Sequence, residues 1–443
     1  MSTNREKAST PQELCSLAQK NNNKTKGSGQ YKKAWIRWLS LAIESIREDL
    51  GENLLSTADD TIRDEFEKLF FDLGVAADVG TMPSFESDAA RKGYALEFFC
   101  RGRALAEFLL ETPLAMAEEN DDDESNILYP RFWTRSLRSS ECPILASVCK
   151  ADMAQSKELA TYEIVSLGSG PGFDFIGVAL AAAFSIYTTR SSSQPDLCSN
   201  FNDLSHKIHV TAMDYEKGWG DLVASMDQST KNILTPSNDN FFPAPNDPSV
   251  LSCDWGGTCD ITKSILHDQS NANCKNLLLG SDDIAQKGTP KLWICQYCVA
   301  ENAKALRESN FVFWKELVQE MPAGTLLLIT EVVPRVWPEL VRMFHREGLL
   351  PFVNIGFRKG STKQFLLEKR SNRHPESVGE DGDHPFALLD ARTREQLEHF
   401  EELASYHERK VDSGWIRQER KENGGSIYHE ELLRSKRSMN DQN

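Results

Sequence analysis

The chain has 443 residues, of which 40% are hydrophobic, and it carries a formal net charge of −16. This length and apolar content are enough for one large folded domain with a smaller region beside it. The acidic balance argues against broad, non-specific binding of nucleic acid, although it is compatible with a local basic face. Such a face is indicated in the first 40 residues, where eight Lys and Arg stand against two Asp and Glu.

The ten cysteines form no short repeating framework, and the polar N-terminus has no secretory signal. Reduced thiols in an intracellular protein, in the cytoplasm or the nucleus, are therefore expected. The longest apolar stretch, 177–186, is shorter than the roughly 20 residues that span a bilayer, so no membrane partner is expected. Nothing in the sequence indicates the oligomeric state.

Four regions are expected in chain order. They are a disordered tail at 1–30, an N-terminal helical region at 31–150, an α/β domain at 151–370 and a charged tail at 371–443. Apolar residues at three- and four-residue spacing predict helices from Tyr31 onward, at Thr61–Leu73 and at Ala89–Glu111. The helical region would serve as a lid or a substrate-binding part.

Within 151–370, short apolar runs alternate with helical segments, which is typical of a parallel α/β sheet. The expected strands are Glu163–Leu167, Lys207–Asp214, Val250–Asp254, Leu292–Cys298, Thr325–Val333, Val353–Arg358 and Gln364–Lys369. The expected helices are Asp174–Phe184, Gly218–Ser225, Ala300–Glu320 and Val336–Glu347. The link between the last two strands is too short for a helix, which predicts an antiparallel hairpin.

Three polar stretches are expected to be loop insertions. They are Ser191–Ser205, Met226–Pro248 and Ser264–Lys287, and all three are rich in turn-forming residues.

A glycine-rich turn follows the first strand of this α/β region. Gly168, Ser169, Gly170 and Gly172 lead directly into an apolar helix with Asp174 in its first turn. Glycine lets a backbone turn with positive φ, and the helix N-terminus presents free N–H groups to a ligand. A dinucleotide loop would have its third glycine where Phe173 stands. The spacing here is G-x-G-x-G.

This spacing resembles the first motif of the class I S-adenosylmethionine-dependent methyltransferases. The resemblance implies a Rossmann-like, seven-stranded sheet with an antiparallel terminal hairpin, and S-adenosylmethionine as the cofactor. It places Asp214, at the end of the second strand, on the ribose hydroxyls, with Tyr215 beside it. It places Asp254 on the adenine amino group, with Trp255 covering the ring. Alternatively, Trp255 belongs to the core and Asp254 opens a turn.

The fourth strand would end beside the transferable methyl group, since ligands bind at the carboxyl ends of strands in open α/β sheets. Gln296 is expected to contact the cofactor, Tyr297 to orient the acceptor, and Glu301 to act as the general base. Transfer would be a direct SN2 displacement, helped mainly by positioning. Alternatively, Tyr297 packs in the core and Glu301 is a favourable acid at a helix start.

The methyl acceptor is less well defined. Residues 295–298 lack the Pro-Pro motif of enzymes that methylate exocyclic amino groups, and 330–335 lack the nucleophilic Cys of 5-methylcytosine enzymes. Arg131, Trp133 and Arg135 alternate basic and aromatic side chains, a pattern that suits phosphates and stacked bases of RNA. Alternatively, they belong to a helix whose aromatic face packs on the sheet.

The chain also resembles, loosely and over about half its length, eukaryotic methyltransferases that include a large-subunit ribosomal RNA uridine-N3 methyltransferase. RNA, at a base nitrogen, is the acceptor class that this resemblance implies. A protein or small-molecule methyltransferase and a non-catalytic cofactor-binding module stay open as alternatives.

No metal is expected. Cys295 and Cys298 fall in a predicted strand, where their side chains would point to opposite faces. His206, His209 and His267 are expected to be surface or loop residues and not metal ligands.

Overall fold

The computed structural model describes residues 28–54, 60–79, 84–111, 160–190, 206–234, 251–280, 290–331, 336–347, 349–351 and 363–369. The expected C-terminal tail, nearly all of the expected N-terminal tail, the insertion Ser191–Ser205 and the strand Val353–Arg358 lie outside these residues. The prediction of four regions therefore stays a prediction.

The chain has an α/β fold around one sheet of parallel and antiparallel strands, with the strand order β3-β2-β1-β4-β5-β7-β6. Six strands have five residues or more, namely β1 (Ala160–Leu167), β2 (His206–Asp214), β3 (Leu251–Thr258), β4 (Leu292–Gln296), β5 (Leu326–Glu331) and β7 (Lys363–Lys369). The three-residue β6 (Leu349–Pro351) forms the edge. β1 to β5 pair in parallel, and β7 runs antiparallel to β5 and β6, so the expected antiparallel end of the sheet is present, although its edge strand is Leu349–Pro351 and the expected strand Val353–Arg358 lies outside the described residues.

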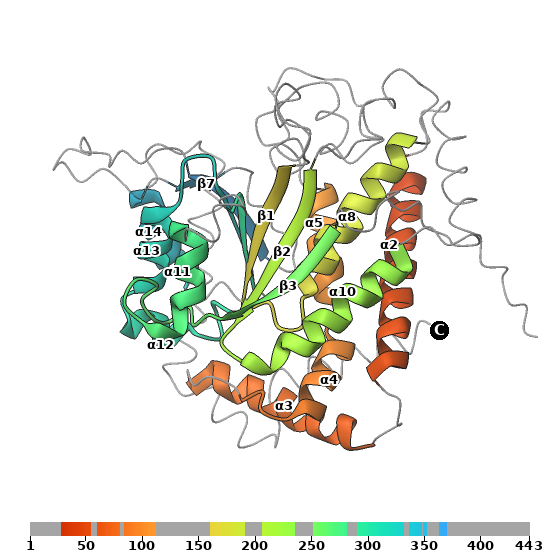
Figure 1. Cartoon of the computed structure of the whole chain (residues 1–443), viewed down its shortest axis with the longest axis horizontal. Helices are drawn as coiled ribbons and strands as arrows, with labels where there is room; N and C mark the ends of the chain where they lie inside the picture. Colours follow the sequence, from red (N-terminus) through yellow and green to blue (C-terminus); the bar gives the residue numbers. More distant parts are fainter. Residues whose placement is uncertain are drawn as a thin grey trace, which may run out of the picture.

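Helices cover both faces of the sheet (Figure 1). On one side lie α11 (Ala272–Leu279), α12 (Ala303–Glu308), α13 (Val312–Glu320) and α14 (Trp337–Arg346). On the other lie α2 (Ser28–Leu54), α5 (Cys100–Glu111), α8 (Phe173–Arg190) and α10 (Gly220–Leu234). Each face of the sheet has its own hydrophobic cluster, so the central strands are buried on both sides and are almost continuously apolar.

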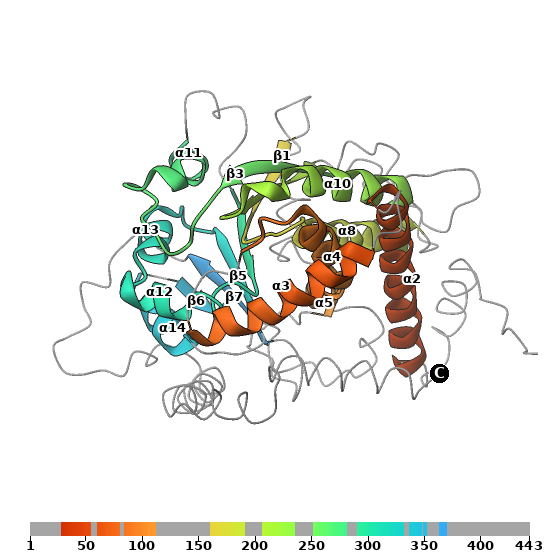
Figure 2. The ribbon, with the colours of Figure 1, turned by 90° about the horizontal axis from the view of Figure 1, so that it is seen from below.

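Two N-terminal helices lie at the edge of the sheet where the parallel strands end. α3 (Asp60–Val79) and α4 (Asp88–Glu97) are drawn below the sheet in Figure 1, and in Figure 2, seen from below, α3 crosses in front of it. Their buried side chains belong to the same hydrophobic cluster as those of β1, β2 and α8. The N-terminal helices therefore share a core with one face of the sheet.

The packing of α5 on α8 is especially close. A Cβ on Gly177 would lie 2.7 Å from Leu105 Cβ and 2.8 Å from the Gly102 carbonyl oxygen. A Cβ on Gly102 would lie 3.0 Å from the Phe173 carbonyl oxygen. Glycine at these two positions lets the two helices touch through their backbones, which fixes α5 against the start of α8.

Several predicted boundaries were wrong for local reasons. The expected helix Ala300–Glu320 is two helices, because Asn310 and Phe311 adopt left-handed φ values of 53° and 56° between α12 and α13. The expected helix Ala89–Glu111 is divided into α4 and α5 at Phe98. β4 stops at Gln296, two residues early.

Two expected insertions contain regular structure. The stretch 226–248 begins inside α10, which continues to Leu234, and the stretch 264–287 contains a 3-10 turn and α11. Among the described residues, no helix is both long enough and apolar enough to cross a membrane.

Candidate functional site

A pocket lies where the carboxyl ends of four parallel strands meet. The space between its lining residues is about 540 Å³, a figure that includes open solvent. Its walls come from the turn after β1, the residues after β2, β3 and β4, and the N-terminal helices. The lining residues are Phe85, Tyr94, Arg101, Gly168, Gly170, Asp214, Tyr215, Trp219, Cys259, Ile261, Tyr297, Cys298, Glu301 and Asn302.

The glycine turn forms the floor of this pocket. Gly168 has a φ of 65°, and a Cβ there would lie 2.0 Å from Cys298 Sγ. Glycine at this position can adopt the left-handed backbone conformation, and its missing side chain lets the turn after β4 approach closely. Ser169 donates its N–H to the Met213 carbonyl at 3.0 Å, which ties the turn to the end of β2.

Asp214 links the glycine turn to the end of β2. Its Oδ2 accepts the N–H of Gly170 at 3.0 Å, and its Oδ1 accepts that of Glu216 at 3.1 Å. The side chain is buried, and burial raises the pKa of Asp214 to about 6 against the lowering effect of these two N–H donors. A carboxylate has about four acceptor sites, so two bonds leave capacity for a ligand.

The predicted adenine-binding pair does not reach the pocket. β3 continues to Thr258, so Asp254 lies within the strand, with its side chain 68% exposed and 3.0 Å from His209 Nε2. Trp255 lies against the start of α10, since a Cβ on Gly220 would be 3.3 Å from its Cδ1. The assignment of these two residues is corrected: the chain that lines the pocket after β3 is Cys259 and Ile261.

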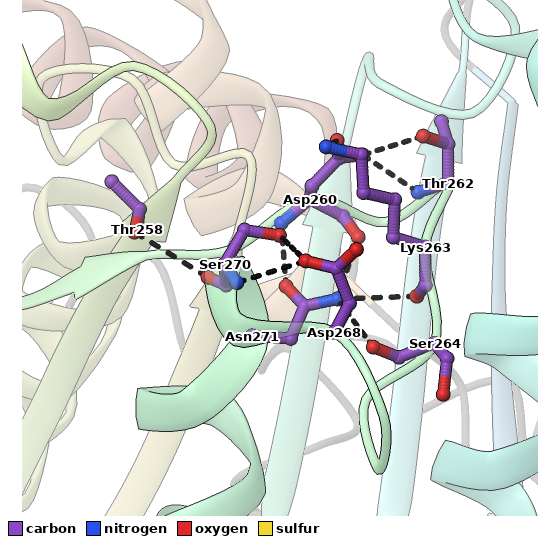
Figure 3. Close-up of polar contacts among 8 residues, drawn as sticks. All are labelled: Thr258, Asp260, Thr262, Lys263, Ser264, Asp268, Ser270 and Asn271. Carbon is purple, nitrogen blue, oxygen red and sulfur yellow. Dashed lines mark hydrogen bonds and ion pairs between the residues drawn. The ribbon is translucent and has the colours of Figure 1, made fainter.

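The loop after β3 is held by a dense polar network (Figure 3). Asn271, which is fully buried, donates its amide to the carbonyls of Asp260, Lys263 and Ser264 at 3.0 to 3.2 Å and accepts the Asp260 N–H at 2.7 Å. Glu316 on α13 accepts the Ser264 hydroxyl at 2.8 Å. One asparagine thus fixes the short segment that carries Cys259 and Ile261.

The turn after β4 supplies Tyr297, Cys298 and Glu301. Tyr297 has a left-handed φ of 60° and donates its N–H to the Thr330 carbonyl at 2.8 Å. Glu331, buried at the end of β5, accepts the N–H groups of Val299 and Ala300 at 2.6 and 3.0 Å. Burial raises the pKa of Glu331 to about 8. Sequence reasoning missed this residue, although an acid at the end of a buried strand was a usable signal.

Glu301 faces the pocket, as predicted for a general base. Burial raises its pKa to about 7, while the Arg101 charge acts in the opposite direction. A carboxyl group with this pKa is partly ionised at neutral pH and can accept a proton there. Tyr297 also lines the pocket, so the structure brings together both residues that were expected to be catalytic.

Behind the glycine turn, Asp174 links three elements. Its Oδ2 accepts the Ser166 hydroxyl at 2.5 Å, and its Oδ1 accepts the Gln296 side-chain amide. Burial raises the pKa of Asp174 to about 6. Four predicted cofactor contacts lie outside the pocket lining, namely Asp174, Gln296, Ser169 and Gly172. Asp174 and Gln296 instead hydrogen-bond to each other behind the turn.

Aromatic side chains from the N-terminal helices and from the residues after β2 form the roof of the pocket, opposite the glycine turn. The ring centroid of Phe85 lies 5.3 Å from that of Tyr94, 6.1 Å from that of Tyr215 and 5.0 Å from that of Trp219. Phe173 stands where a dinucleotide-binding loop would have its third glycine. Its ring is buried, and its centroid lies 6.0 Å from that of Tyr94. Sequence reasoning missed the contribution of the N-terminal helices, because no local pattern shows which distant segment will cover a pocket.

Two predictions about polar residues were wrong. His209 is 7% exposed, and its Nδ1 lies 2.8 Å from Glu163 Oε2, so it is neither a surface nor a loop residue. Cys298 follows the left-handed Tyr297 and turns back toward β4. The Cys295 thiol and burial together raise its pKa well above the ordinary value. The two thiols therefore do not point to opposite faces.

The predicted RNA-contacting residues Arg131, Trp133 and Arg135 lie outside the described residues, as does the whole segment 129–138. Within the part of the chain that the structure describes, no three His, Cys, Asp or Glu side chains are arranged to hold a metal ion.

No protein-family model matches the chain, and no curated protein sequence matches it. Among solved structures, the crystal structure of a mutant of MtNAS is 12% identical and covers 74% of this chain and 97% of its own, with a TM-score of 0.23. A likeness this low carries no argument about function, so the site itself is the basis for the proposal that follows.

Proposed function

We propose that the chain is an S-adenosylmethionine-dependent methyltransferase with a class I, Rossmann-like fold. One observation carries the proposal. The glycine turn after β1, the acid at the end of β2 and the acid after β4 line a single pocket, through Gly168, Asp214 and Glu301. These are the three places at which the resemblance in the sequence puts the cofactor and the reacting centre. The strand order and the terminal hairpin support the same fold.

The residues of the pocket fit the cofactor. Asp214 has acceptor capacity left for a ribose diol. Ile261 supplies an apolar wall after the true end of β3. We therefore assign to Ile261 the ring-covering role first expected of Trp255, and no carboxylate of the pocket lining takes the role first expected of Asp254.

When bound, S-adenosylmethionine supplies a methyl group on a sulfonium that is already electrophilic. The chain has then to orient the acceptor and hold its proton. Glu301 takes that proton on its carboxylate, which a pKa of about 7 leaves partly ionised at neutral pH. Tyr297, held in a left-handed conformation, lines the same pocket as Glu301 and orients the acceptor.

The acceptor is tested by incubating the full chain with labelled S-adenosylmethionine and a cell extract fractionated into RNA, protein and small molecules. RNA is the acceptor that residues 129–138 and the family resemblance favour. Label in the RNA fraction that nuclease removes is the expected result. Label only in protein or small molecules would exclude RNA. Cofactor binding without label in any fraction would leave a non-catalytic module.

A further inference from the structure

The charge in the roof of the pocket belongs to Arg101. It is the second residue of α5, and Gly102 beside it packs on the Phe173 carbonyl at the start of α8. The backbone that carries Arg101 is thus fixed against the helix that follows the glycine turn. Arg101 lines the pocket together with residues from four strand ends.

Aromatic rings position the guanidinium. Its Cζ lies 4.4 Å from the ring centroid of Tyr297, 4.6 Å from that of Phe98 and 5.2 Å from that of Tyr94. One guanidinium nitrogen also donates a hydrogen bond to the Tyr94 hydroxyl. Rings that stack on a guanidinium hold it without neutralising its charge.

Glu301, which lines the same pocket, is a carboxylate whose charge interacts with that of Arg101, but the two side chains form no direct ion pair. Among the described side chains, none forms an ion pair with this guanidinium, whereas Arg91 and Arg307 both do so elsewhere. Burial raises the pKa of Tyr94, so its hydroxyl stays neutral. Glu301, which also lines the pocket, has a pKa of about 7 and is only partly ionised at neutral pH.

A guanidinium that lines a pocket without a direct ion pair is suited to a planar oxyanion, because its remaining N–H donors can bind such a group through parallel hydrogen bonds. We propose that Arg101 is the anion-binding residue of the pocket and takes a carboxylate or phosphate group of a bound ligand. The proposal rests on the proposed function for the identity of that ligand. The two sources of the anion are the amino-acid end of the methyl donor and the methyl acceptor.

The test compares ligands with and without the carboxylate. Calorimetry on the wild type, Arg101→Gln and Arg101→Lys uses S-adenosylhomocysteine and 5′-methylthioadenosine, which lacks the amino-acid end. If the donor supplies the anion, Arg101→Gln loses about ten- to a hundred-fold in affinity for the former and keeps its affinity for the latter. Arg101→Lys keeps part of the affinity, because the charge remains.

If the acceptor supplies the anion, both affinities stay unchanged in Arg101→Gln, and the KM for the acceptor rises about tenfold or more while kcat is kept. Arg307→Gln, a partly exposed guanidinium paired with Glu339 on the far side of the sheet, is the matched control and should change none of these values. Equal losses for both nucleosides, or no change in affinity and KM, would overturn the proposal.

A failure of the proposed function is seen separately. If the wild type binds neither nucleoside, the cofactor assignment is wrong and inorganic phosphate becomes the probe. Phosphate should then raise the Tm of the wild type and not that of Arg101→Gln, because a ligand that binds only the folded state stabilises it. The same Tm rise in both proteins would contradict the role of Arg101.

Discussion

The guanidinium of Arg101, on α5, lies over the ring of Tyr297, just after β4, with 4.4 Å between Cζ and the ring centroid. This contact joins two segments almost 200 residues apart in the chain. It lies in the pocket where the glycine turn and Asp214 also meet. The N-terminal helices are therefore part of the site.

Glu301→Gln should reduce methyl transfer by about 10²- to 10⁴-fold, the usual contribution of a general base. A base works in its ionised form, so wild-type activity should rise as the pH passes the Glu301 pKa of about 7, and the variant should lose this rise. The measurement is the initial rate on the acceptor found by labelling, as a function of pH. Glu308→Gln, exposed on α12, is the control. If Glu301→Gln transfers the methyl group as fast as the wild type, Glu301 is not the general base.

Gly168→Ala should impair both folding and cofactor binding. The residue has a φ of 65°, and its new Cβ would meet Cys298 Sγ at 2.0 Å. The left-handed backbone alone costs about 1–2 kcal/mol, and the steric clash adds about 1–3 kcal/mol.

Gly324→Ala is the matched control for this glycine. Its φ is 86° and nothing lies within 4 Å of the new Cβ, so it isolates the backbone cost from the clash. Chemical denaturation of both variants gives the difference. Equal losses of stability would mean that the glycine turn and the turn after β4 do not touch.

Glu331→Gln should flatten the dependence of stability on pH. In the folded chain, burial raises the pKa of Glu331 from 4.5 to about 8, so the folded state keeps a proton that the unfolded state releases. The contribution of Glu331 to stability is therefore complete below pH 4.5 and is lost as the pH rises toward about 8. Gln accepts the same N–H groups without ionising.

The midpoint of urea denaturation, measured across this pH range, checks the prediction for Glu331. The wild-type midpoint should fall more steeply than that of Glu331→Gln, and the exposed Glu320→Gln should follow the wild type. Parallel curves for all three proteins would contradict a buried, proton-binding Glu331.

Asn271→Ala should lower stability by about 1–3 kcal/mol and also weaken S-adenosylhomocysteine binding several-fold. The side chain holds three carbonyls of the loop that carries the pocket wall, and alanine frees that loop. Asn232→Ala, whose amide makes an exposed contact with Asp49, is the control. A loss of stability with unchanged ligand affinity would show that Asn271 supports the fold without shaping the pocket.

The strands and the glycine turn could be predicted from the sequence because buried parallel strands are continuous apolar runs and because positive φ favours glycine. Glu163–Leu167 and the glycines after it are local patterns of this kind. Asp214 and Glu301 were predicted because strand ends in such sheets gather at one edge.

Two parts of the pocket could not be predicted from the sequence: the roof that the N-terminal helices form, and the wall that the residues after β3 form. Arg101 reaches the site only because α5 packs on α8, which is a tertiary contact without a local signal. The end of β3 was placed too early because Asp254 and two glycines resemble a turn, whereas the pairing of β2 with β3 continues to Thr258 through a bulge. The role of Asn271 depends on loop geometry that only the folded chain defines.

The central claim is that Gly168, Asp214 and their neighbours bind S-adenosylmethionine. Calorimetry with S-adenosylhomocysteine and with NAD tests it most directly, on the wild type, Asp214→Ala and the exposed control Asp221→Ala. The wild type and the control should bind S-adenosylhomocysteine and not NAD, and Asp214→Ala should lose about ten- to a hundred-fold in affinity. Binding of NAD alone, or an affinity for S-adenosylhomocysteine that Asp214→Ala leaves unchanged, would contradict the claim.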